Sequence, residues 1–301
     1  MRAVHLTILS RSARVHTTRR LVEAARAMGH RARVIDPLQV EMGLGASAPG
    51  GGPAAYWRRR RFPRTDVVVP RIAPSIHQYG LAVVKQLELL GLPVLNGAAS
   101  IAASRDKMRS LQLLAAAGVP VPRTVMASDA SGLKEMVRLV GGAPVLVKLL
   151  AADGKSGVMV CESLQSLEAA LEAILGLGQN IVVQQYLKGA RGRDLRALVV
   201  GGRVVAALRR RPAPGKLSRN LRRGARFEKA VLPQAHAAIA VEAAGVLGLE
   251  VCAVDMLDVK GGPRVFEVNA SPSIREAEAA CGVDVASAVV AHAVALTSRA
   301  A

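Results

Sequence analysis

Aromatic side chains are scarce in this chain of 301 residues, because one Trp, three Tyr and three Phe make up only 2% of it. Proteins that bind single-stranded nucleic acid stack its bases on aromatic rings, so the composition argues against that binding mode. Hydrophobic residues nevertheless account for 51% of the chain. We therefore expect a folded protein whose core consists mainly of Ala, Val, Leu and Ile.

Paired cysteines and long apolar runs are also missing. Cys161, Cys252 and Cys281 stand alone, without a Cys-x-x-Cys pair. This argues against a disulfide framework or a zinc site and fits a reducing compartment. No uncharged apolar run reaches the length of about 18 residues that a membrane span needs, and the stretch 4–9 is too short and polar for a signal peptide. We expect a cytoplasmic protein.

Several common catalytic motifs are absent. There is no Gly-x-Ser-x-Gly elbow, and the six histidines show no metal-ligand spacing. Gly154-Lys155-Ser156 resembles the end of a P-loop, but Leu149 stands where the first glycine of that motif is required. The segment 152–157 therefore either closes over phosphates with its backbone N–H groups or is an ordinary turn.

Negative charge is in short supply. The formal net charge is +19, with nine Lys and 32 Arg against 22 acidic residues. The excess favours a phosphate-bearing, nucleic-acid or polyanionic protein partner, although an arginine-biased, solvated surface explains it equally well. We interpret the run 58–61 as a solvated face. The denser basic segment, residues 209–211 followed by 218–224, either holds a triphosphate, an acyl phosphate or an acidic substrate, or is an RNA-binding or solvated loop.

Strand and helix patterns alternate over the first hundred residues, which is typical of a parallel sheet covered by helices. We expect the segment 43–61 to interrupt this pattern as a surface loop, and the segment 100–117 to form one long helix. From residue 194 onward, apolar runs around Gly201-Gly202 and Gly261-Gly262 predict antiparallel hairpins. The fold class is therefore α/β (α+β), with expected units at 1–96, 97–187 and 188–301.

Three oxygen-bearing side chains near the end of the chain form a candidate metal site: Asp255, Glu267 and Asn269. Glu267 and Asn269 are two apart in a strand and so share a face, and carboxylate and amide oxygens suit Mg²⁺. A two-residue turn at Gly261-Gly262 would place Asp255 opposite Val268, on the wrong face. A metal site therefore predicts a loop of three or five residues, or a bulge. The alternative is an ordinary hairpin that ends in an Asn turn.

Single polar residues supply further candidates. Lys148 lies at the end of an apolar strand, where it would need an anion such as a phosphate. Lys107 lies near the start of a helix; it is either a site residue or an ordinary solvated lysine. Asp194 either binds a ribose hydroxyl or pairs with Arg191 or Arg193.

Taken together, these segments resemble the RimK family of ATP-grasp ligases over nearly the whole chain. The similarity includes Arg105–Ser110, Pro70-Arg71-Ile72, Gly141–Pro144, Asn220-Leu221 and Glu267–Pro272. It implies an ATP-grasp fold, with a Rossmann-like N-terminal domain followed by two ATP-grasp subdomains. It also implies ATP and two Mg²⁺ ions as cofactors, with Mn²⁺ as a substitute. The nucleotide would contact Lys107, Lys148, Gln185, Tyr186, Asp194, Ser218, Arg219 and Asn220, and the ions would be bound by Asp255, Glu267 and Asn269, with Glu267 bridging.

The family adds glutamate to the C-terminus of a ribosomal protein, so the resemblance implies an ADP-forming ligase with L-glutamate and an acidic protein tail as substrates. An acyl phosphate forms first, and Arg211 and Asn220 would stabilise the later tetrahedral oxyanion. A homotetramer, and contact with nucleic acid only through the ribosome, are further implications. The chain departs from the family pattern at Ala152, Lys155, Gln185, Arg222, Ser273 and Arg275. The alternatives are a ligase for another amino acid or acceptor, and a non-catalytic basic protein that binds RNA or the ribosome.

Overall fold

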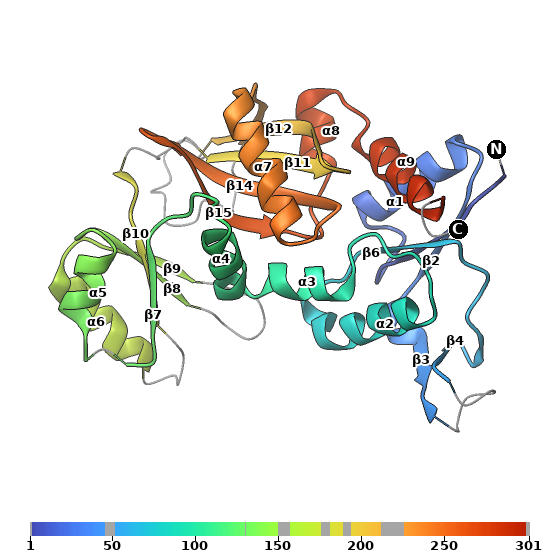
Figure 1. The fold of residues 1–301 in the computed structure, drawn as a ribbon, viewed down its shortest axis with the longest axis horizontal. Helices are drawn as coiled ribbons and strands as arrows, with labels where there is room; N and C mark the ends of the chain where they lie inside the picture. The colour runs from blue at the N-terminus through green and yellow to red at the C-terminus, as the bar shows by residue number, and fades with distance from the viewer. Residues whose placement is uncertain are drawn as a thin grey trace.

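The computed structural model describes residues 2–45, 52–129, 131–149, 157–175, 181–188, 194–211 and 226–298. They form three units along the long axis of the molecule (Figure 1). The N-terminal unit lies at one end, the central unit at the other, and the C-terminal unit between them (Figure 1). The mixed α/β (α+β) class expected from the sequence is confirmed.

The N-terminal unit contains the predicted parallel sheet. Its strands β1 (His5–Leu9), β2 (Arg31–Ile35) and β6 (Val67–Pro70) lie in the order β2-β1-β6. Helix α1 (His16–Ala27) connects β1 to β2, and α2 (His77–Leu89) follows β6. Short 3-10 turns occur at Pro37–Gln39 and Pro74–Ile76. After α2, Val94 adds only an isolated bridge to Val68 of β6.

The expected surface loop at 43–61 is wrong, because much of the segment pairs as a small antiparallel sheet. Its strands are β3 (Val40–Gly43), β4 (Ala54–Trp57) and β5 (Arg60–Arg61). Helix α2 supports this sheet, since Gln86 Nε2 donates to the carbonyl oxygens of Gly43 and Ala54. Local composition suggested a loop, whereas these contacts come from a helix more than thirty residues further along the chain.

The single helix expected over 100–117 is also wrong. Helix α3 (Ala98–Arg105) ends at Asp106, and α4 (Lys107–Ala116) begins immediately after it. Asp106 has an extended backbone, and its Oδ1 accepts hydrogen bonds from the backbone N–H groups of Met108 and Arg109. It is therefore an N-cap, and the chain changes direction there.

The central unit is an antiparallel sheet with one covered face. Its order is β7-β10-β8-β9, formed by β7 (Thr124–Ala127), β8 (Val145–Leu149), β9 (Val158–Cys161) and β10 (Ile181–Gln185). Helices α5 (Leu133–Leu139) and α6 (Leu164–Leu175) pack on it, with Val145 and Val147 in the shared core. They lie on the side of this sheet that faces away from the C-terminal unit (Figure 1).

The C-terminal unit is a five-stranded antiparallel sheet in the order β13-β12-β11-β14-β15. The strands are β11 (Asp194–Val200), β12 (Arg203–Arg211), β13 (Arg226–Lys229), β14 (Val251–Val259) and β15 (Gly262–Asn269). Helix α7 (Gln234–Val246) packs with α4 on one face. Helices α8 (Arg275–Cys281) and α9 (Val285–Thr297) cover the apolar half of the other face, which includes Leu198 and Ala253. No helix in the described ranges is long and apolar enough to cross a membrane.

Candidate active site

A β-bulge brings the candidate metal ligands together. The turn between β14 and β15 is Lys260-Gly261, with Val259 opposite Gly262, so the expected turn at Gly261-Gly262 is one residue out. The register then shifts between Asp255 and Met256, and this leaves Asp255 directly opposite Glu267. The predicted bulge is confirmed. Side chains opposite each other in an antiparallel pair lie on one face with Cβ atoms about 5 Å apart.

Asn269 completes this set of oxygen ligands. It pairs with Ala253, two residues from Asp255, and so belongs to the same face of the sheet. Its Oδ1 accepts a hydrogen bond of 2.9 Å from the backbone N–H of Ser271. The Asn turn weighed as the alternative is therefore present as well. An amide oxygen has two lone pairs, so the turn leaves one for a metal ion.

Arg196 of β11 neutralises Asp255. The two residues are opposite each other, and Arg196 Nε and Nη2 donate to Asp255 Oδ1 and Oδ2 at 2.7 Å each. Asp255 is only 3% exposed. Burial lowers the pKa of Arg196, but the hydrogen bonds and charge of Asp255, helped by the charges of Glu267 and Glu276, outweigh it and raise the pKa overall. The guanidinium is thus bound to the same carboxylate oxygens that a metal ion would use, and the two cations would share them.

A second arginine pairs with Asp194 on the same face. Arg210 of β12 donates to Asp194 Oδ2 from Nε at 3.1 Å and from Nη2 at 2.8 Å. Burial raises the pKa of Asp194, the charge of Arg210 opposes it, and the negative charge of Asp255 adds to the rise. Arg191 and Arg193, the partners weighed from the sequence, lie outside the described residues.

Two buried oxygens near this cluster have no hydrogen-bond partner in the described part of the chain: Ser271 Oγ and Glu276 Oε2. They follow Asn269 by two and seven residues. Within the same described ranges, no group of three or more His, Cys, Asp or Glu side chains forms a metal cage. Two carboxylates and an amide agree with that finding, because Mg²⁺ uses few protein ligands and takes the rest from water and phosphates. The donor set therefore fits Mg²⁺.

Lys148 and Lys107 are positioned by two different units. Val145 and Val147 point into the core beneath α5 and α6, so strand alternation turns Lys148 to the opposite face of the sheet. That face is the one directed toward the C-terminal unit (Figure 1). Lys107 is the half-buried first residue of α4, next to the Asp106 cap. Their contact with phosphate stays a prediction.

A cleft of about 560 Å³ lies between the central unit and the β14–β15 hairpin, a size that suits a nucleotide. Its lining includes Gln185, Tyr186, Lys188, Arg123 and Arg264. The backbone N–H of Gln185 donates to Arg123 O at 2.8 Å. Adenine recognition by Gln185 and Tyr186 stays a prediction, and this bond restricts the role of Gln185 to its carbonyl and side chain.

The remaining candidates are less well placed. Arg211 follows Arg210 in β12, points to the opposite face of the sheet, and donates to Glu228 Oε2 at 3.1 Å. Ser218, Arg219, Asn220 and Arg222 lie outside the described residues, as do Ala152 and Lys155. The sequence prediction missed Arg196, and it placed Arg210 in the basic segment without foreseeing its pairing with Asp194. Strand alternation gave a signal for Arg196, because it is two residues from Asp194 and so shares its face.

Comparison with known proteins agrees with this geometry. A model of the RimK-like ATP-grasp domain matches residues 104–293, and a model of the RimK pre-ATP-grasp domain matches residues 4–101. The chain belongs to the RimK family of ATP-grasp proteins. The matched ranges divide the RimK-type chain just after the N-terminal unit.

Relatives support the assignment to the RimK family, and solved structures support the fold. Proteins named probable alpha-L-glutamate ligase from Teredinibacter turnerae and Thioalkalivibrio sulfidiphilus are each 44% identical, over 95% of this chain and 94% and 93% of theirs. The ATP-grasp ligase PsnB with a minimal precursor has a TM-score of 0.75 at 24% identity, covering 98% of this chain and 99% of its own. A RimK domain protein from Sphaerobacter thermophilus has a TM-score of 0.71 at 24% identity, covering 96% and 99%.

The protein is therefore an ATP-dependent ligase of the RimK type. Its fold implies binding of ATP together with Mg²⁺, and a related PsnB structure with a TM-score of 0.73 is described as a complex with precursor, Mg and ADP. The relatives are named for glutamate, and the PsnB structure is described as a complex with a minimal precursor.

Proposed function

We propose that the protein joins L-glutamate to the C-terminal carboxylate of a ribosomal protein with an acidic tail, with hydrolysis of ATP to ADP. The observation that carries the proposal is the pairing of Asp255 with Glu267 across the bulge, on the same face of the sheet as Asn269. Two Mg²⁺ ions, or Mn²⁺ in their place, would be held by these three residues. Bound there, they would neutralise charge on the transferring phosphoryl group.

The chemistry has two stages. An acceptor carboxylate oxygen attacks the γ-phosphorus of ATP, ADP leaves, and an acyl phosphate forms. The amine of glutamate then attacks the acyl carbon, and phosphate leaves the tetrahedral intermediate. Lys148 and Lys107 would neutralise the ATP phosphates, while Ser218, Arg219 and Asn220 would complete the phosphate contacts and Asp194 would hold the ribose.

Arg211 and Asn220 would stabilise the tetrahedral oxyanion. For Arg211 this requires release from Glu228 and reorientation around the end of β12, because Arg211 lies on the opposite face of the sheet from Asp194. Release is undemanding, since the side chains of Arg211 and Glu228 are 48% and 55% exposed. Such exposed pairs contribute at most about 1 kcal/mol. Asp194 likewise has to share its Oδ2 between Arg210 and a ribose hydroxyl, and a carboxylate oxygen can accept both.

The test is ADP formation with ATP, Mg²⁺, glutamate and an acceptor with an acidic tail, followed by mass spectrometry of the acceptor. We expect Glu267→Gln to lower the rate by at least about 100-fold, since 2.7 kcal/mol of lost transition-state stabilisation has that effect. Glu228→Gln, a matched change on β13, should keep most of the activity. ADP formed only with another amino acid would replace glutamate in the proposal. Absence of ADP together with tight RNA binding at physiological salt would reject it.

A cytoplasmic location, a homotetramer, and contact with nucleic acid only through the ribosome are part of the same proposal. Light scattering tests the oligomer. Binding to ribosomes with and without the acceptor protein tests the last point. Loss of ribosome binding when the acceptor is removed is the expected result.

A further inference from the structure

The chain that follows Asn269 is held by the N-terminal half of the protein through its backbone. Ser104 Oγ donates to Val268 O at 2.8 Å, and Asn96 Nδ2 donates to Ala270 O at 2.9 Å. The backbone N–H of Ile274 donates to Thr17 Oγ1 at 3.3 Å. The end of β15 and the residues after it, 268–274, are thus positioned by side chains that lie more than 150 residues earlier in the chain.

Arg71 makes the central contacts of this set. It directly follows β6, and its own N–H donates to Leu9 O at 2.8 Å, which fixes its backbone to the parallel sheet. Its Nη2 donates to Ser271 O at 3.2 Å and to Pro272 O at 2.7 Å. Burial lowers the pKa of Arg71 to about 10, so the group remains a cation at neutral pH. Its bonds to the two carbonyls are charge-assisted and stronger than neutral ones.

These bonds reach the candidate metal ligand through the backbone of one residue, Ser271. Ser271 accepts from Arg71 with its carbonyl oxygen and donates with its N–H to Asn269 Oδ1 at 2.9 Å. The second bond sets the rotamer of Asn269 and the direction of its remaining lone pair. A ligand fixed in this way needs no reorganisation when an ion binds.

We propose that Arg71 is a positioning residue that holds Asn269 ready to bind a metal ion, acting through Ser271. The inference rests on the proposed metal site. Arg71 does not contact the ion, and its charge alone would have the opposite effect, since a cation near a metal site repels the metal. When Arg71 is replaced by a neutral residue, loss of positioning should weaken metal binding, whereas loss of the positive charge alone should strengthen it.

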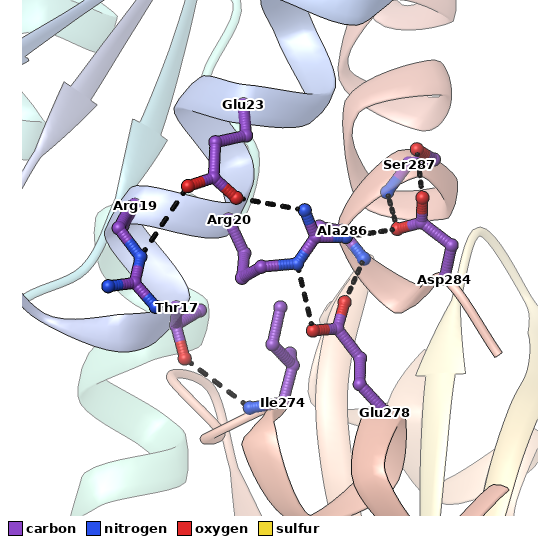
Figure 2. Close-up of polar contacts among 9 residues, drawn as sticks. All are labelled: Thr17, Arg19, Arg20, Glu23, Ile274, Glu278, Asp284, Ala286 and Ser287. Carbon is purple, nitrogen blue, oxygen red and sulfur yellow. Dashed lines mark hydrogen bonds and ion pairs between the residues drawn. The ribbon is translucent and has the colours of Figure 1, made fainter. Parts of the chain in front are cut away.

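Arg20 provides a matched control, because it also joins the N-terminal unit to the end of the chain without contacting residues 268–274. Figure 2 shows Arg20 of α1 between Glu278 of α8 and Asp284, which caps α9. The two bonds are 3.1 Å each. Loss of Arg20 weakens the contact between the units and leaves the Arg71–Ser271–Asn269 chain in place.

The experiment measures Mn²⁺ binding by electron paramagnetic resonance in the presence of ADP, with the urea unfolding midpoint as a second readout. We expect Arg71→Met to weaken Mn²⁺ binding by 10- to 100-fold, the usual effect of losing a group that orients a metal ligand. Arg71→Lys keeps a cationic donor and should fall between Met and the wild type. Arg20→Gln should lower the unfolding midpoint and leave Mn²⁺ affinity within two-fold of the wild type.

Other results would overturn the inference or the proposed metal site. Unchanged or tighter Mn²⁺ binding by Arg71→Met would overturn the positioning role, and so would equal weakening by Arg20→Gln. If Arg71→Met does not fold, Arg71→Lys decides alone, since wild-type affinity in that variant would contradict the inference. Failure of the proposed site looks different: wild-type protein with ADP would not bind Mn²⁺, or Asp255→Asn would bind it as tightly as the wild type.

Discussion

Replacing Arg196 by methionine tests whether Asp255 is a buried charge that needs a cation. The side chains of Arg196 and Asp255 are 21% and 5% exposed and joined by two bonds of 2.7 Å. Removing one partner of such a pair costs about 3–5 kcal/mol of unfolding free energy, because the other charge stays buried and uncompensated. Arg211→Met is the matched control, as it breaks an exposed pair on the same sheet worth at most about 1 kcal/mol.

The assay is urea unfolding at neutral pH without divalent ions, repeated with Mg²⁺ and ADP. Ligand at about 100 times its Kd stabilises the folded state by about 2.7 kcal/mol. We expect Mg²⁺ and ADP to raise the unfolding free energy of Arg196→Met more than that of the wild type. In the variant the ion does not share Asp255 with a guanidinium. A loss no greater than that of Arg211→Met, or an equal gain by variant and wild type, would refute this reasoning.

Two further predictions concern a turn and a buried acid. Gly201 and Gly202 both have positive φ, 56° and 72°, so an alanine at either costs about 1–2 kcal/mol. A Cβ at Gly201 would lie 2.5 Å from His292 Nδ1, whereas nothing lies within 4 Å of a Cβ at Gly202. Gly201→Ala should therefore lose about 1–3 kcal/mol more unfolding free energy than Gly202→Ala. Equal unfolding free energies of the two variants would contradict this prediction. Burial raises the pKa of Asp194 above its unfolded value, so its ionisation destabilises the folded state as pH rises from about 4 toward 7. The unfolding free energy of the wild type relative to Asp194→Asn should fall over that range, and a rise would show that Arg210 outweighs burial.

The sequence predicts those parts of the site that depend on local periodicity. Alternation in a strand places Glu267 and Asn269 on one face, and the requirement that Asp255 join them predicts the bulge. The position of the turn is not predicted, because Gly261-Gly262 and Lys260-Gly261 both suit a two-residue hairpin and packing further along the strands selects between them. Gly261 and Gly262 both have positive φ, which glycine adopts without steric cost.

The missed features depend on contacts between distant segments. Gln86 from α2 bonds to both β3 and β4, and the break at Asp106 follows from a side-chain cap within an apolar helical pattern. Arg210 and Asp194 become partners only once the β11–β12 register is set. Periodicity carries no information on such pairings, which tertiary packing determines.

The two arginine–aspartate pairs also predict a change when metal binds. Each pair is close to neutral, so an ion at Asp255 adds positive charge next to Arg196, and repulsion favours displacement of the guanidinium from at least one carboxylate oxygen. The charges of Glu267 and Glu276 also raise the pKa of Arg196. Glu276 Oε2 has no hydrogen-bond partner among the described residues. We therefore expect Glu276 to accept hydrogen bonds from the displaced guanidinium. The Nε–H resonance of Arg196 should shift on addition of Mg²⁺ and ADP to the wild type. In Glu276→Gln the shift should be smaller and Mg²⁺ affinity lower, and an identical shift in both proteins would exclude Glu276 as that acceptor.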